Sequence, residues 1–190
     1  MADSIIVGNW VGKEALAAVG ATASIVNTLI GFFNGVSLGA SVVISQYYGA
    51  KDEYNLRRAI HTTVVTTFLF GLLFTGIGIA FTPAMLRLMD TPADVFSVAQ
   101  EYLTIYFAGV AGLVLYNMLS GILRAMGDSR RPLYFLAFCC VANVVLDIWF
   151  VIGLGWGVAG AAGATILAQA FSAIALLLLM SRTTKTGGFV

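Results

Sequence analysis

Charged side chains are scarce in this sequence. Of its 190 residues only 10% are Asp, Glu, Lys or Arg, whereas 59% are hydrophobic. A soluble domain carries about 25% charged residues, and it cannot bury so large an apolar fraction. The mean hydropathy of +0.93 indicates that lipid surrounds most of the chain. We therefore expect an all-α integral membrane protein, since helices satisfy their own backbone hydrogen bonds in lipid.

Cysteine and histidine are also rare, and their scarcity argues against several chemistries. The two cysteines, Cys139 and Cys140, are adjacent in an apolar run. Neighbouring residues on a helix point in different directions, so we expect neither a mutual disulfide nor a metal site. The sequence has no Ser-His-Asp set, no HExxH, no P-loop and no CxxC, which predicts no enzyme and no cofactor. Its net charge of +1, with no long basic cluster, gives no indication of nucleic-acid binding.

What the sequence does have is long apolar segments separated by short polar loops. A first segment, 1–11, is too short to cross a bilayer, which takes about 20 residues. We interpret it as the outer part of a helix whose beginning is missing. With it, the chain is expected to form a six-helix transmembrane bundle, first helix truncated, as a single domain over 1–190. The five full segments are predicted at 15–46, 56–81, 97–124, 132–153 and 157–180.

Positive residues gather in alternate loops. The loops at 47–55, 125–131 and 181–190, with their flanking helix ends, hold eight Lys and Arg residues. The other loops hold only Lys13 and Arg87. Cytoplasmic loops carry the excess of positive charge. This bias therefore predicts that the three positively charged loops and both chain termini are cytoplasmic. The expected location is the plasma (inner) membrane, crossed several times.

Two acids lie inside apolar segments, where a carboxylate costs at least about 2.5–3.5 kcal/mol. They are Asp3 in the first segment and Asp147 near the outer end of 132–153. At 1.5 Å per residue, Asp3, Asp147 and Thr165 lie within about 5 Å of one depth. Asn143 is one turn from Asp147 on the same face. The sequence therefore permits one polar cluster of Asp3, Asn143, Asp147 and Thr165 in the outer half of the bundle.

Such a cluster has a clear chemical use. Two carboxylates in a low-dielectric site resist being charged together, so the cluster can bind and release a proton. Alternatively, Na⁺ can be held at Asp3 and Asp147 through oxygen ligands. A third interpretation is an inert hydrogen-bond network that specifies helix packing. Weaker candidates, for the lining of a cavity, are Asn27, Asn34, Tyr116, Asn117 and Gln169.

Glycine is frequent inside the apolar segments. Gly31, Gly35 and Gly39 repeat every four residues on one face of 15–46. Small residues at this spacing let helix backbones approach closely in lipid. We therefore expect this face to pack tightly within the bundle, with a dimer face as the alternative.

Several motifs follow one another along nearly the whole chain. They are Ala2-Asp-Ser-Ile-Ile-Val-Gly-Asn-Trp-Val-Gly, Gln46-Tyr-Tyr-Gly-Ala-Lys-Asp, Gly121-Ile-Leu-Arg-Ala-Met-Gly-Asp-Ser-Arg-Arg-Pro, Asn143-Val-Val-Leu-Asp and Gly157-Val-Ala-Gly-Ala-Ala-Gly-Ala-Thr. In this order they resemble the N-terminal lobe of multidrug and toxic compound extrusion (MATE) transporters. The resemblance implies one lobe of a twelve-helix transporter, here as a fragment that lacks its C-terminal lobe.

The resemblance also implies a function: a cation-coupled antiporter, driven by H⁺ or Na⁺, that exports drugs or other small organic compounds, often cationic. In prokaryotic members the cation site of this lobe uses residues that match Asp3, Asn143, Asp147 and Thr165. The expected partners are those compounds, the coupling ion, membrane lipid, and the missing lobe or a second copy. Two alternatives stay open, a lipid-linked precursor flippase and a non-transporting membrane subunit or remnant.

Overall fold

The structure, a computed structural model, describes residues 7–185, with the side chains at 14 and 182–185 outside the description. Most of this part of the chain is helical, with short turns between the helices, and it contains no strand. After a helical turn at 7–10, the helices are α2 (Lys13–Gly49), α3 (Glu53–Leu88), α4 (Ala93–Ala108), α5 (Val110–Ala125), α6 (Arg130–Asp147), the π-helix η1 (Ile148–Gly153) and α7 (Gly157–Lys185).

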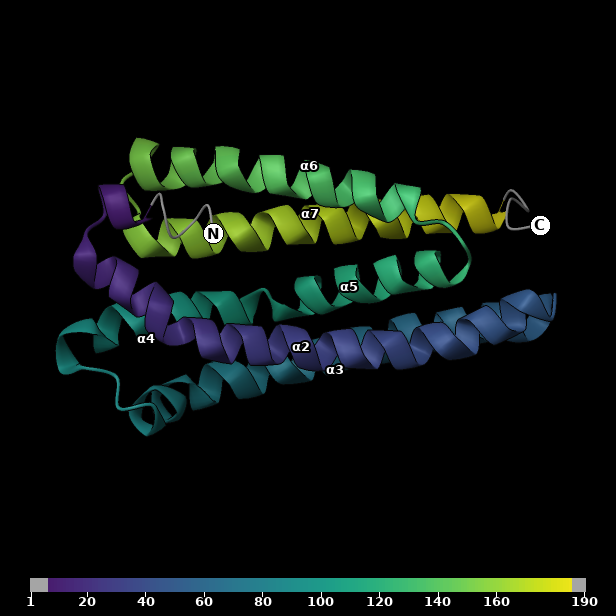
Figure 1. The fold of residues 1–190 in the computed structure, drawn as a ribbon, viewed down its shortest axis with the longest axis horizontal. Helices are drawn as coiled ribbons and strands as arrows, with labels where there is room; N and C mark the ends of the chain where they lie inside the picture. The colour runs from purple at the N-terminus through teal and green to yellow at the C-terminus, as the bar shows by residue number, and fades with distance from the viewer. Residues whose placement is uncertain (1–6, 186–190) are drawn as a thin grey trace.

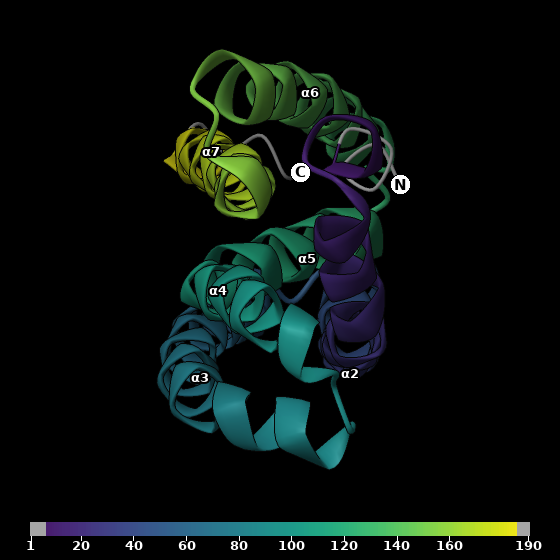
Figure 2. The same cartoon turned by 90° about the vertical axis from the view of Figure 1, so that its left-hand side faces the viewer.

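The helices lie in two groups along one long axis (Figure 1). One group is the antiparallel pair α6 and α7, and the other contains α2, α3, α4 and α5 (Figure 2). Within the second group, α5 lies next to the α6–α7 pair, so that it packs against α2, α3 and α7. Because it is surrounded on several sides, most of its side chains are buried, including Leu119, Ile122 and Leu123.

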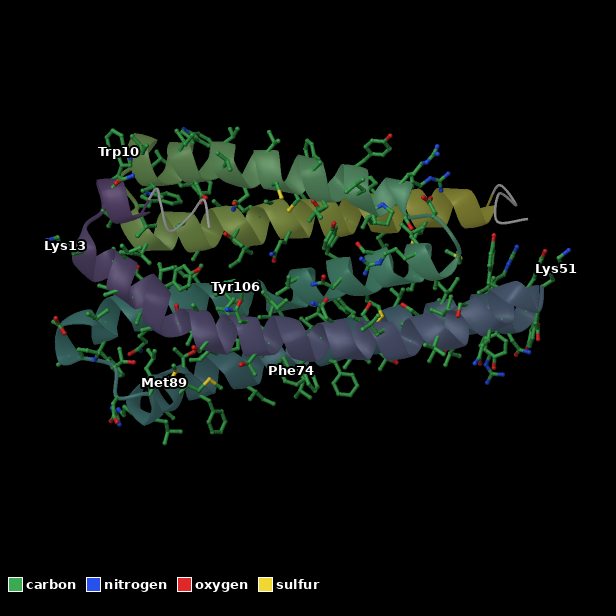
Figure 3. The ribbon with its side chains drawn as sticks, in the orientation of Figure 1. Trp10, Lys13, Lys51, Phe74, Met89 and Tyr106 are labelled. Carbon is green, nitrogen blue, oxygen red and sulfur yellow. The ribbon has the colours of Figure 1, made fainter. Side chains whose placement is uncertain are left out.

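Helix α2 spans the whole length of the molecule. Lys13 lies at one end of the bundle and Lys51, just beyond the helix, lies at the other (Figure 3). Its 37 residues correspond to about 55 Å at 1.5 Å per residue. That length exceeds the hydrocarbon core of a bilayer, which is about 30 Å thick, so α2 is long enough to carry both lysines beyond it.

The outer surface of the bundle is apolar. Large side chains such as Leu38 (67% exposed) and Phe171 (71% exposed) point away from the protein. Four helices are long and apolar enough to cross a membrane, and α4 with α5 forms a fifth span if the bent pair is counted as one. Apolar side chains exposed along whole helices are stable only in lipid. The chain is therefore a multi-pass membrane protein.

The segment expected as one span at 97–124 is divided in the structure. Helices α4 and α5 meet at Gly109 and are bent by 47°. A Cβ atom at Gly109 would overlap the side chain of Ile166 on α7. The glycine therefore lets α7 pack directly against the bend, a relationship that hydropathy alone does not reveal.

The prediction that Gly31, Gly35 and Gly39 pack tightly within the bundle is wrong. A Cβ atom at any of the three would meet nothing within 4 Å. Close approach occurs elsewhere, for example where a Cβ at Gly71 would lie 2.9 Å from the Cα of Ala111 on α5. Regular spacing defines a small-residue face, but only the position of the neighbouring helix decides whether that face is used.

Candidate functional site

The residue at the end of α6 is the most deeply buried acid in the described part of the chain. Asp147 is the last residue of α6, and its exposed fraction is 0%. The chain continues directly into the π-helix η1. A π-helix has wider turns than an α-helix, and such segments occur frequently at functional sites. The backbone that follows Asp147 therefore departs from regular α geometry within a membrane span.

One turn before Asp147, a side-chain hydrogen bond joins α6 to α7. The amide Nδ2 of Asn143 donates to the hydroxyl Oγ1 of Thr165 across 3.1 Å. The Thr165 hydroxyl in turn donates to the backbone carbonyl of Ala161, also at 3.1 Å. Thr165 therefore accepts one hydrogen bond and donates another, which fixes its side chain. Since Asn143 and Asp147 share a helix face, the three predicted residues of α6 and α7 gather in one region.

Small residues hold this region together. A Cβ atom at Gly160 would lie 3.1 Å from the backbone of Phe150 in η1. Ala161, Ala162 and Ala164, which follow it on α7, have exposed fractions of 0%. Close packing of α7 on η1 therefore fixes the backbone on the far side of Asp147.

The remaining predicted site residue, Asp3, lies outside the described residues, so its role stays a prediction. The described chain begins four residues later with Val7, which is fully buried. Val7 packs in an apolar cluster that includes Val151 of η1 and Ala161 of α7. Val7 therefore lies against η1, the helix that directly follows Asp147, and against α7.

Each of the groups in this region offers an oxygen atom that can act as a ligand. They are the Asp147 carboxylate, the Asn143 amide and the Thr165 hydroxyl. Oxygen ligands suit a proton or a hard cation, whereas transition metals prefer His and Cys. Among residues 7–185, no group of three or more His, Cys, Asp or Glu residues is arranged to hold a metal ion. These oxygen-bearing groups beside a buried carboxyl group are chemically suited to bind a proton or a hard cation.

The five weaker candidates lie in different surroundings. Asn34 contributes to a polar groove of about 680 Å³ between α2 and α5, together with Ser37, Ser41 and Arg124. Tyr116 is buried, and its hydroxyl donates to the carbonyl of Pro132 at 3.4 Å. The structure places the other three as follows: Asn117 donates to the Leu113 carbonyl at 3.0 Å, Gln169 is half-buried, and Asn27 is exposed.

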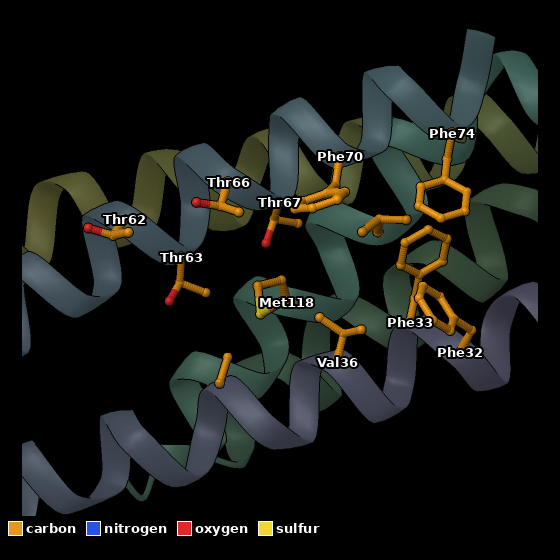
Figure 4. Close-up of a pocket in the computed structure, with 12 residues that line it drawn as sticks. Phe32, Phe33, Val36, Thr62, Thr63, Thr66, Thr67, Phe70, Phe74 and Met118 are labelled. Atoms are coloured by element: carbon orange, nitrogen blue, oxygen red, sulfur yellow. The ribbon is translucent and has the colours of Figure 1, made fainter. Parts of the chain in front are cut away.

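A second cavity was not anticipated from the sequence. It measures about 380 Å³ and lies between α2, α3 and α5 (Figure 4). The signal for it was present on α3, where threonine pairs and then two phenylalanines recur every four residues and so share a face. The cavity is lined by Phe32, Phe33, Val36, Ala40, Thr62, Thr63, Thr66, Thr67, Phe70, Phe74, Val114 and Met118.

The sequence of this chain is similar to those of known proteins. The family described as MatE matches residues 1–149. The chain is similar to the probable multidrug resistance protein YpnP of Bacillus subtilis, at 37% identity over 88% of this chain and 38% of the relative. It is also similar to the probable multidrug resistance protein YoeA of Bacillus subtilis, at 36% identity over 93% of this chain and 39% of the relative.

The chain is also similar to a solved structure. A crystal structure of MATE in the bent conformation matches with a TM-score of 0.88 and 30% identity, over 92% of this chain and 39% of the solved one. The chain thus spans about two fifths of the length of the relatives it matches. The similarity therefore extends over most of this chain.

Proposed function

The chain belongs to the MatE family, and on that premise we propose that it takes part in exporting small organic compounds in exchange for H⁺ or Na⁺. The names of its relatives, which include probable multidrug resistance proteins, support this substrate class. The fold supports a membrane location. In this proposal the chain supplies one helical lobe, and a second lobe or a second copy supplies the other side of the transport pathway.

The observation that carries the coupling proposal is the full burial of Asp147 within a membrane span. An ionised carboxylate is expensive in this environment, and a bound cation removes most of that cost. The Asn143–Thr165 hydrogen bond one turn away provides two further oxygen atoms on the same side. A proton needs only the carboxylate, whereas Na⁺ needs several oxygen ligands, and this region offers both.

Binding of the cation changes the charge that the surrounding helices must accommodate at Asp147. Neutral Asp147 fits the apolar junction of α6, η1 and α7, whereas ionised Asp147 favours access to water or to a cationic substrate. The ion therefore shifts the equilibrium between two packings by the difference in its affinity for them. A tenfold difference in affinity corresponds to about 1.4 kcal/mol. We propose that η1, which lacks regular α-helical hydrogen bonding, is the joint that moves.

Competition for one carboxylate makes the process an exchange. An organic cation and the coupling ion both lower the cost of ionised Asp147, and both cannot occupy it together. Release of one therefore accompanies binding of the other, as antiport requires. The eight-to-two distribution of positive residues supports a plasma-membrane orientation with the loops around Lys51 and Arg130 in the cytoplasm.

Flux measurements test this proposal. A hybrid transporter is made by putting this chain in place of the matching region of YpnP, reconstituted in proteoliposomes, and given a pH or Na⁺ gradient. We expect gradient-dependent efflux of a cationic dye from the hybrid and at least about a tenfold loss in Asp147→Asn. Asp94→Asn, which changes an exposed acid at the start of α4, is the matched control. Equal flux in the hybrid and in Asp147→Asn rules out the coupling role.

A further inference from the structure

The cavity between α2, α3 and α5 has an aromatic end. Phe32, Phe33 and Phe74 pack there as an aromatic cluster, with ring centroids 5.1–5.8 Å apart. Phe70 and Met118 line the cavity next to them (Figure 4). The cavity lies on the opposite side of α5 from the α6–α7 pair. It shares no lining residue with the candidate cation site.

The other end of the cavity is mildly polar. Four threonines of α3 line it, from Thr62 to Thr67. From Thr62 to Phe74 the cavity extends over twelve residues of α3, or about 18 Å. One leaflet of a bilayer has a hydrocarbon depth of about 15 Å, half of the 30 Å core. The midpoint of α3 falls beside Phe70, so the cavity extends from the middle of the membrane toward one surface.

Positive charge lies where the cavity approaches that surface. Arg58 precedes Thr62 by one helical turn on the same face, and Arg57 is its neighbour; both are exposed. Of the nearby acids, Asp52 accepts hydrogen bonds from Asn55 at the start of α3, and Glu53 follows it. Along α3, both arginines lie between these acids and the first threonine of the cavity.

We propose that this cavity binds one acyl chain of an anionic phospholipid, with the phosphate held by Arg57 and Arg58. The lining contains no charged residue, so an organic cation finds no counter-charge inside it. An acyl chain matches the cavity in length and polarity, since it begins beside the threonines and ends against the phenylalanines. Basic residues at the membrane surface beside such pockets are a known way of selecting anionic lipids.

Native mass spectrometry of the purified chain tests the proposal, with dioleoylphosphatidylglycerol and dioleoylphosphatidylcholine as probes. We expect preferential retention of the anionic lipid, and a loss of about tenfold or more in Arg57→Gln/Arg58→Gln, since each basic residue contributes about fivefold. Val36→Trp and the milder Ala40→Leu fill the cavity and should displace the lipid. Leu69→Trp, which places the same bulk on an exposed face of α3, is the control. Circular dichroism checks that each variant is folded.

Any of the following results would overturn the proposal: equal retention of the two lipids, unchanged retention in both folded cavity-filling variants, or equal loss in Leu69→Trp. A neutral apolar dye that binds the cavity and is not displaced by phosphatidylglycerol would also overturn it. Asp147→Asn should retain the lipid normally. Failure here is thus distinguishable from failure of the proposed cation coupling.

Discussion

The amide nitrogen of Asn143 lies 3.1 Å from the hydroxyl oxygen of Thr165, to which it donates a hydrogen bond between α6 and α7. Side-chain hydrogen bonds between membrane helices contribute only about 0.6 kcal/mol on average. This bond therefore adds little to the total stability of the bundle. Its larger effect is geometric, because it fixes two oxygen-bearing side chains one turn from a buried carboxylate.

Removal of the Thr165 hydroxyl should weaken cation binding more than it weakens the fold. Thr165→Val keeps the shape of the side chain but cannot bond Asn143, whereas Thr165→Ser keeps the hydroxyl. We expect Thr165→Val to lower the free energy of unfolding by about 0.5–1.5 kcal/mol and Thr165→Ser to retain cation binding. A double-mutant cycle with Asn143→Leu, measured by unfolding in detergent, should show coupling of similar size. Zero coupling would mean that the two side chains do not interact.

Protonation of Asp147 should be visible directly. Infrared spectra of the chain in lipid nanodiscs should contain a protonated-carboxyl band that changes with pH and is missing in Asp147→Asn. The physical reason is that a carboxyl group buried in a membrane span is stabilised in its neutral form. Asp94→Asn, at an exposed position, should leave the band intact. A spectrum identical in the wild type and Asp147→Asn would remove the proposed proton site.

The close approach of α3 to α5 should make Gly71 intolerant of a side chain. A Cβ there would lie 2.9 Å from the Ala111 Cα, a backbone atom that cannot rotate away. Gly71→Ala should lower the free energy of unfolding by about 1–3 kcal/mol, as overpacking typically does. Gly76→Ala, on the same helix with nothing within 4 Å of its Cβ, should be neutral or slightly stabilising. Thermal unfolding in detergent compares them, and equal melting temperatures would contradict the packing argument.

The loop before α3 should show a local pH dependence. Hydrogen bonds from the side chain and then from the backbone N–H of Asn55 lower the pKa of Asp52 below its ordinary value. Because the folded-state pKa is lowered, Asp52 stabilises the helix start above its unfolded pKa, and this contribution disappears as the pH falls through the folded pKa. A carboxyl-carbon NMR titration should find the pKa raised in Asn55→Ala and unchanged in Tyr54→Ala. An unaltered Asp52 pKa in Asn55→Ala would show that the hydrogen bonds from Asn55 do not lower it.

Orientation can be measured with single cysteines introduced into a chain whose Cys139 and Cys140 are replaced by serine. An impermeant maleimide applied to the outside of cells should label Asp94→Cys and leave Lys51→Cys and Ser129→Cys unlabelled. The expectation rests on the excess of positive residues in the loops around Lys51 and Ser129. External labelling of Lys51→Cys would reverse the proposed orientation.

Much of this protein follows from composition and periodicity. The apolar fraction and scarce charge required membrane helices, since lipid offers the backbone no hydrogen-bonding partners. The presence of Asp147, Asn143 and Thr165 in apolar segments singled them out, because polar groups there are costly. Helix geometry alone then placed Asn143 and Asp147 on one face.

Only the tertiary structure decided how those segments meet. The sequence indicated a continuous span at 97–124, whereas the structure bends it by 47° at Gly109, where α7 packs closely through Ile166. It marked the Gly31–Gly35–Gly39 face for packing, whereas the close contacts form at Gly71 and its partners. The cavity beside Phe74 needs three helices from distant parts of the chain. Periodicity fixes which residues share a face of a helix, but contact between faces depends on the position of every other helix, which no local pattern encodes.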